Sequence, residues 1–169
     1  MKLVRYRDKQ KERYGVLINN RIVCLPRLAK RLNEKLPERL EDFVALSPRN
    51  VENAEHLIER ARKADIEHAS SLVSEVKLLA PVSCPPKIVC LGLNYRDHAA
   101  EQNATIPDEP IIFLKPRTSI IGPNESIVKP DLVKKLDYEA ELAIVIGRKA
   151  KSVHVSEARS YIFGYTILN

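Results

Sequence analysis

The sequence has no tryptophan, only five glycines and only three cysteines among its 169 residues. Cys24, Cys84 and Cys90 have no CxxC or Cys/His zinc spacing, and their odd number does not suggest a disulfide framework, so we expect a reducing, intracellular setting. No apolar run approaches the roughly 20 residues of a transmembrane helix, and the N-terminus turns charged before a signal peptide's apolar region can form. These absences predict a soluble, cytoplasmic protein with no membrane partner.

The charge of the chain is moderately basic, with 28 Lys plus Arg against 22 Asp plus Glu and a net charge of +6. The basic residues are spread along the chain, without a Gly/Arg-rich tail or a basic block interleaved with aromatics. We therefore predict no nucleic acid partner. The competing hypothesis, a nucleic-acid-binding protein, predicts an affinity that falls steeply with salt.

The first 75 residues have the pattern of a small α+β domain. Three strands are predicted at residues 3–7, 13–18 and 21–25, and Asn19-Asn20 forms a tight turn before the third, because Asn tolerates positive φ. A short helix is marked by three leucines, with Pro37 expected to end or restart it, and a longer helix starts at Ser47-Pro48. The apolar positions of the two helices are Leu28, Leu32 and Leu36, then Val51, Ala54, Leu57, Ile58 and Ala61.

The pattern changes after residue 75, where "VKLLAPVSCPPK" holds three prolines and no helix can continue. Short apolar strands follow with few helices between them, which favours a mostly β second domain over residues 76–169. The predicted strands are residues 87–92, 111–115, 119–122, 141–147 and 161–168.

Two glutamates, Glu139 and Glu141, stand at the start of the apolar stretch "LDYEAELAIVIG" (136–147). On a strand successive side chains alternate between faces, so both carboxylates point the same way. If both are ionised and buried, a cation or a proton must relieve their repulsion, and Mg²⁺ or Mn²⁺ suits an all-oxygen ligand set. The alternative is a strand that enters the sheet from solvent with both glutamates hydrated at its edge.

A second candidate pair lies in "LGLNYRDHAAEQ" (91–102), just after an apolar strand. Gly92 and Asn94 allow the chain to turn, and in a helix that follows, His98 and Glu101 stand three residues apart on one face. A carboxylate beside an imidazole can orient it and make it a general base. The alternative is a surface helix with an ordinary histidine and glutamate.

A third candidate is Lys115 in "FLKPRTS" (113–119), at the end of an apolar strand that Pro116 stops. A lysine at this position can hold a substrate carboxylate or an enolate oxygen as a point charge. It can equally cap the end of the strand in solvent.

These candidates fall within four blocks that, in order and spacing, resemble the fumarylacetoacetate hydrolase family. The blocks are "KIVCLGLNYRDHAAEQ", "PIIFLKPRTSIIGPNESI", "DYEAELAIVIG" and "GYTILN", within residues 87–169. The likeness is strongest to its shorter members: acylpyruvate hydrolases, 2-hydroxyhepta-2,4-diene-1,7-dioate isomerases and related decarboxylases. It implies a β-roll or barrel-like catalytic domain of mixed sheets, an α+β fold that is mostly β, preceded by a small variable N-terminal domain. It also implies a homodimer.

The resemblance assigns a role to each candidate residue. Glu139 and Glu141 become two carboxylate ligands of a catalytic Mg²⁺ or Mn²⁺. His98 and Glu101 become the dyad that activates water, on a lid segment that runs to about Asp108, and Lys115 lines the substrate pocket. The substrates implied are 2-oxo acids, β-diketones and unsaturated 2-hydroxy diacids, which react through a metal-stabilised enolate.

One departure from the family pattern concerns the third metal ligand. In the family an Asp follows the "GYT..N" block at once, whereas this chain ends at Asn169. We therefore expect an incomplete roll, either because the chain is a fragment of a longer protein or because it is a truncated relative. The sequence is compatible with hydrolase, isomerase and decarboxylase chemistry, and also with a non-catalytic binding protein on the same fold.

Overall fold

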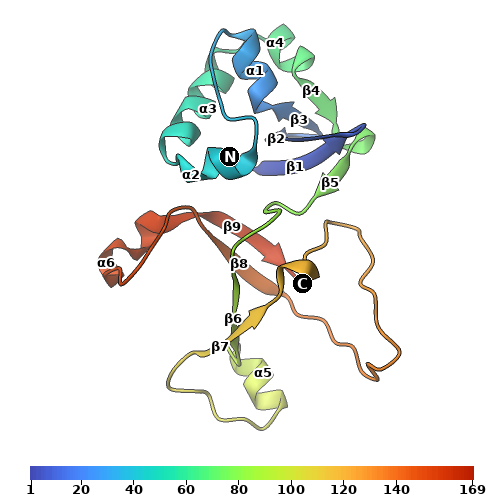
Figure 1. Ribbon diagram of the computed structural model, residues 1–169, viewed down its shortest axis with the longest axis vertical. Coiled ribbons are helices and arrows are strands. Elements are labelled where there is room, and N and C mark those ends of the chain that lie inside the picture. Colours follow the sequence, from blue (N-terminus) through green and yellow to red (C-terminus); the bar gives the residue numbers. More distant parts are fainter. The chain divides into compact units, whose positions relative to one another are not determined.

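The computed structural model describes all 169 residues, and the chain divides into two compact units. The first contains Met1–Val82 and Gly122–Asn169, and the second contains Ser83–Ile121. Helices and small antiparallel sheets together form the α+β class that the sequence predicted (Figure 1). None of the helices has the length and apolar character that crossing a membrane requires.

A five-stranded antiparallel sheet in the order β4-β3-β2-β1-β5 forms the N-terminal part of the first unit (Figure 1). Asn19 joins β2 to β3 with a φ of 54°, the left-handed conformation that Asn tolerates, and this confirms the predicted turn. The strand β5 continues this sheet past residue 75 by pairing with β1. The strands are β1 (Leu3–Asp8), β2 (Lys11–Ile18), β3 (Arg21–Cys24), β4 (Ser70–Leu72) and β5 (Lys77–Leu79).

Four helices pack with this sheet: α1 (Leu25–Arg31), α2 (Leu40–Ala45), α3 (Arg49–Arg60) and α4 (Lys63–His68). The sequence predicted α1 and α3 but missed α2 and α4, because six residues show less than two turns of periodicity. The first helix ends before Pro37, which was expected to end or restart it. That helix stops at Arg31, and Asn33 then turns the chain with a φ of 58°.

The start of the longer helix differs slightly from the prediction. It begins at Arg49, just after the expected Ser47-Pro48 start. The predicted apolar stripe is confirmed, since Ala54 and Leu57 are buried and Ile58 packs against the core from the same helix. The stripe therefore located the buried face of α3 correctly.

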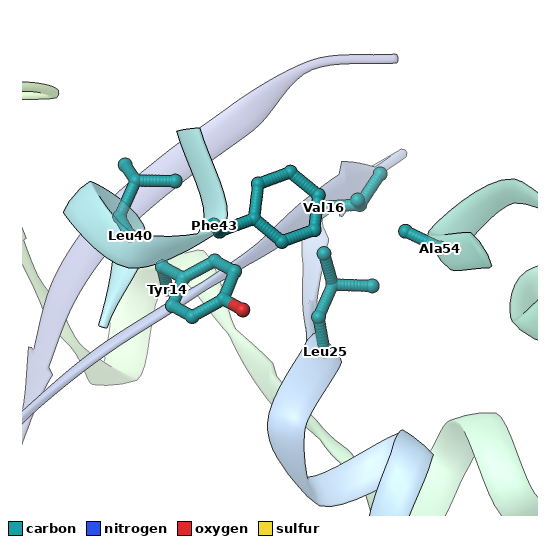
Figure 2. Packing of buried hydrophobic residues seen from close by; sticks show 6 residues of the cluster. All are labelled: Tyr14, Val16, Leu25, Leu40, Phe43 and Ala54. Atoms are coloured by element: carbon teal, nitrogen blue, oxygen red, sulfur yellow. The ribbon is translucent and has the colours of Figure 1, made fainter. Parts of the chain in front are cut away.

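The core of the N-terminal part lies between the sheet and the helices, and Phe43 stands at its centre (Figure 2). The Phe43 ring is fully buried, and its centroid lies 5.4 Å from that of Tyr14 on β2. The Tyr14 hydroxyl donates a 2.6 Å hydrogen bond to the Pro37 carbonyl, so its buried polar atom has a partner. The cluster in Figure 2 consists of Tyr14, Val16, Leu25, Leu40, Phe43 and Ala54.

The remaining strands of the first unit form the antiparallel hairpin of β8 (Glu141–Ile146) and β9 (Ile162–Leu168), and the short helix α6 (Val155–Ala158) lies between them. Phe163 of β9 packs against the same core, with its ring centroid 6.4 Å from that of Phe43 in an edge-on arrangement. This contact attaches the hairpin to the N-terminal sheet and its helices.

The second unit consists of the antiparallel pair β6 (Ile88–Gly92) and β7 (Ile111–Lys115), with the helix α5 (Arg96–Glu101) between them. Both strands were predicted. The strand predicted at residues 119–122 was wrong, because Ser119 ends the 3₁₀ turn Arg117–Ser119 and residues 120–122 belong to no strand. Pro116 and Pro123 flank this stretch, and a proline has no backbone N–H to donate to a strand ladder.

Each two-stranded sheet leaves an apolar face exposed. On β8–β9, Leu142 is paired with Ile167 and Ile144 with Tyr165, and all four side chains are exposed. On β6–β7 the corresponding face is formed by Val89, Leu91, Ile112 and Leu114. A two-stranded sheet without a covering layer is at best marginally stable, so the contact of Phe163 with the core is important for β8–β9.

Truncation of Phe43 tests its role as the centre of the core. We expect Phe43→Ala to lower the free energy of unfolding by about 3–5 kcal/mol, because it leaves a cavity beneath α2. Chemical denaturation measures this change. The control is Leu46→Ala, just beyond α2, whose side chain is 60% exposed and whose truncation should cost no more than about 0.5 kcal/mol. Equal effects of the two substitutions would contradict the assignment.

Asp65 of α4 gives the fold a defined acid sensitivity. Its carboxylate accepts hydrogen bonds from Arg31 Nε at 2.7 Å and from Arg62 Nε at 3.1 Å, and these bonds lower the pKa of Asp65 below its usual value of 3.8. A lowered pKa in the folded state contributes stability that is complete above the unfolded-state pKa. This contribution disappears as the pH falls through the folded-state pKa.

We therefore expect Asp65→Asn to reduce the loss of unfolding free energy between about pH 6 and pH 3, because the variant carboxamide does not titrate. Urea titrations at several pH values measure this slope. Glu67→Gln on the same helix is the control, and it should retain the slope of the wild type. An Asp65→Asn slope as steep as the wild-type slope would contradict the role of Asp65.

Candidate functional site

The predicted metal ligands lie at one end of the β8–β9 hairpin. Glu141 is the first residue of β8 and is opposite Leu168 of β9. It is half-buried on the same face as Ala143 and Val145, whereas the apolar residues between them are exposed. Strand pairing therefore fixes the backbone of Glu141 and places its side chain on the less exposed face of the hairpin.

Glu139 lies before the strand and is exposed, so strand pairing does not hold it. Its backbone N–H donates a 3.1 Å hydrogen bond to the Asn169 side-chain oxygen Oδ1, which joins the segment before β8 to the residue after β9. This contact of Asn169 was not predicted from the sequence, although the residue belongs to the block "GYTILN". That the two glutamates face the same way stays a prediction.

The predicted His98–Glu101 pair lies on α5, as expected from its spacing. His98 Nδ1 is 3.9 Å from a Glu101 carboxylate oxygen, and the two side chains are 51% and 78% exposed. This distance exceeds a hydrogen bond, but Glu101 is exposed enough to reach the ring by rotation or through one water. The helix therefore brings the two groups together without a direct bond.

Gln102 is a second partner of His98 that was not predicted from the sequence. Its side-chain nitrogen Nε2 lies 3.0 Å from His98 Nε2. Because an amide nitrogen can only donate, the ring nitrogen accepts, and the neutral ring then carries its proton on Nδ1, toward Glu101. A proton acceptor role for Nε2 requires Gln102 to give way to water or substrate.

The turn that leads from β6 to α5 differs from the sequence expectation. Neither Gly92 nor Asn94 provides the left-handed conformation; Leu93 does, with a φ of 51°. This conformation costs an L-amino acid about 1–2 kcal/mol. Residues held in such conformations are common at functional sites, and this one lies immediately before the helix of His98.

Lys115 is the last residue of β7, opposite Ile88 of β6, and Pro116 ends the strand as predicted. Its ammonium nitrogen lies 5.6 Å from the centroid of the Phe113 ring, within the range of a cation–π contact. His98, Glu101 and Lys115 belong to the second unit, whereas Glu139 and Glu141 belong to the first.

The chemistry of the carboxylates decides which metal they could hold. No group of three or more His, Cys, Asp and Glu side chains is placed to bind an ion. Glu139 and Glu141 alone provide two carboxylates without nitrogen or sulfur donors. This set fits Mg²⁺ or Mn²⁺, since Mg²⁺ keeps several waters and needs only one or two protein carboxylates.

Comparisons with known proteins identify a family that spans the candidate residues. The family model described as fumarylacetoacetate hydrolase C-terminal matches residues 87–169, which contain all five candidate residues. The mitochondrial oxaloacetate tautomerase fahd2 of Xenopus laevis is 39% identical over 132 residues, which cover 78% of this chain and 40% of that protein.

Solved structures of the same fold include two enzymes. Maleylpyruvate hydrolase from Sphingobium, in complex with manganese(II) and pyruvate, matches with a TM-score of 0.69 and 28% identity over 99% of this chain and 57% of that one. The 5-carboxymethyl-2-hydroxymuconate delta-isomerase of Mycobacterium smegmatis matches with a TM-score of 0.65 and 29% identity over 99% of this chain and 54% of that one. This chain spans about half the length of the relatives it matches.

These matches confirm the fold predicted from the sequence, of which the chain covers a part. Through residues 87–169, this chain belongs to the fumarylacetoacetate hydrolase family.

Proposed function

We propose that the protein is a divalent-metal-dependent enzyme that acts on 2-oxo acids at the carbon beside the carbonyl group. The observation that carries the proposal is the pair Glu139 and Glu141 at the end of a paired hairpin, inside the stretch that matches the family. A hydrolase solved with manganese and pyruvate and a relative named as an oxaloacetate tautomerase support the same substrate class.

The proposed roles of the residues follow from their chemistry. Glu139 and Glu141 would hold Mg²⁺ or Mn²⁺, which when bound supplies a Lewis acid that polarises a carbonyl and stabilises negative charge on its oxygen. The Lys115 ammonium would bind a carboxylate of the substrate as a point charge. Its position at a strand end, with Pro116 after it, limits the motion of its backbone.

His98 would be the proton acceptor, through Nε2, once the Gln102 amide is displaced from it. Glu101 would accept the Nδ1 proton in a hydrogen bond and thereby orient the ring. In hydrolysis the proton would come from water, and in tautomerisation or isomerisation it would come from the substrate. The reaction thus depends on what is bound next to Nε2, and the same residues serve each of these reactions.

The identity of the relatives favours tautomerisation of a small 2-oxo diacid as the first reaction to test. C–C hydrolysis of an acylpyruvate is the second, because a maleylpyruvate hydrolase shares the fold. Decarboxylation of oxaloacetate and a non-catalytic binding role are the remaining alternatives. We also propose a homodimer in the cytoplasm, with a small 2-oxo acid or unsaturated diacid as the ligand.

Removal of the two carboxylates tests the metal site. We expect Glu139→Gln with Glu141→Gln to weaken Mn²⁺ binding, followed by electron paramagnetic resonance, by about 100-fold or more, since each substitution removes a charged oxygen ligand. Turnover of oxaloacetate should be lost with it. The control pair Glu109→Gln and Glu157→Gln removes the same charge from two exposed positions and should leave Mn²⁺ affinity unchanged. Unchanged affinity in the Glu139/Glu141 variant would refute the metal site.

Substitution of His98 tests the proton acceptor. We expect His98→Asn to lower turnover by about 10²–10⁴-fold, the usual contribution of a general base, while Mn²⁺ affinity stays as in the wild type. Steady-state kinetics with oxaloacetate and an acylpyruvate measures the loss. The exposed His68→Asn on α4 is the control and should keep full activity. A His98→Asn variant of wild-type activity would rule out the dyad.

A further inference from the structure

Strand pairing holds the two candidate ligands unequally. The register of β8 and β9 runs to Glu141 opposite Leu168 and stops there. Glu141 is therefore part of the ladder, whereas Glu139 lies two residues beyond its end and is exposed. The position of Glu139 therefore depends on contacts outside the ladder.

The Asn169 side chain supplies such a contact. Its Oδ1 atom accepts the Glu139 N–H at 3.1 Å, between residues 30 positions apart in the sequence. In this way a side chain continues the bonding between the two strands beyond the last paired residues. Leu168, next to Asn169, is itself paired with Glu141. The contacts of Glu139 and Glu141 therefore come from two neighbouring residues at the end of β9.

This contact matters because the carboxylates of Glu139 and Glu141 would have to bind the same cation. Two carboxylates bind one cation well only when their separation is already close to that of the complex, because ordering a mobile ligand costs conformational entropy. A neutral amide can restrain Glu139 without adding a negative charge beside the two carboxylates. Asparagine has both properties, an acceptor oxygen and no charge.

We propose that Asn169 is a positioning residue for the metal site, which fixes Glu139 beside Glu141 through the Glu139 backbone N–H. The inference rests on the proposed metal-binding function. It assigns to the Asn169 side chain a role that is separate from direct metal coordination. It identifies one contact that restrains a ligand outside the strand.

Two measurements on the 169-residue chain test this role. The first is the hydrogen-exchange rate of the Glu139 amide, measured by NMR without metal, and the second is Mn²⁺ affinity by electron paramagnetic resonance. We expect Asn169→Ala to accelerate the exchange and to weaken Mn²⁺ binding, each about three- to tenfold, the range expected for one exposed hydrogen bond. The exposed Asn53→Ala on α3 is the control and should change neither quantity.

Asn169→Asp is the conservative variant, because it keeps the acceptor oxygen. It should preserve the slow exchange of the Glu139 amide, and rescue of this rate separates the hydrogen bond from a general effect on folding. Unchanged exchange in Asn169→Ala would overturn the inference, and so would faster exchange with unchanged Mn²⁺ affinity. If the wild type has a protected Glu139 amide but binds no Mn²⁺, the proposed metal site fails and the positioning role fails with it, although the hydrogen bond itself remains.

Discussion

Phe43 packs its fully buried ring against Tyr14 of β2 and Phe163 of β9, and these contacts connect three parts of the chain that are distant in sequence. Tyr14 belongs to the N-terminal sheet, Phe43 to α2 and Phe163 to the hairpin that carries Glu141. Aromatic rings bury large areas and favour tilted or edge-on geometries, both of which are present here. The position of the candidate ligands therefore depends on a core located mainly in the N-terminal residues.

A second attachment joins the N-terminal sheet to the segment that precedes the hairpin. The Lys77 ammonium of β5 lies 2.5 Å from a Glu125 carboxylate oxygen, and Glu125 also accepts the Gly122 N–H at 2.6 Å. These partners lower the pKa of Glu125 below its usual range. Exposed ion pairs contribute little to stability, so the aromatic contact carries more of the attachment than this pair does.

The exposed apolar faces of β6–β7 and β8–β9 are the clearest physical difference between this chain and a closed β-roll. In a soluble protein an exposed apolar patch normally marks a surface that another segment or chain covers. The chain spans about half the length of the relatives that it matches. Phe163 contacts the core at one end of the hairpin, whereas Tyr165 and Ile167 on the same strand stay exposed. The stabilisation that Phe163 provides is therefore local.

Much of the fold was predictable because it depends on local patterns. The alternation of β1 to β3 and the stripe of α3 follow from apolar side chains that recur with the period of a strand or a helix, and β6 to β9 follow from short apolar runs bounded by turn residues. The short helices α2 and α4 were not predictable, since their positions depend on packing against the sheet. The strand predicted at residues 119–122 shows the opposite error, in which a short apolar run follows a 3₁₀ turn and pairs with no other strand.

For the site, the sequence by itself determined which residue types were available: the glutamate pair, the spacing of His98 and Glu101, and the lysine at a strand end. Family resemblance, which is also a property of the sequence, supplied their proposed roles. Only the tertiary structure decided that Glu141 is held by strand pairing while Glu139 is held by Asn169, and that Gln102 occupies one nitrogen of His98. The physical reason is that hydrogen bonds between residues 30 positions apart depend on the register of paired strands, which no local pattern of side chains encodes.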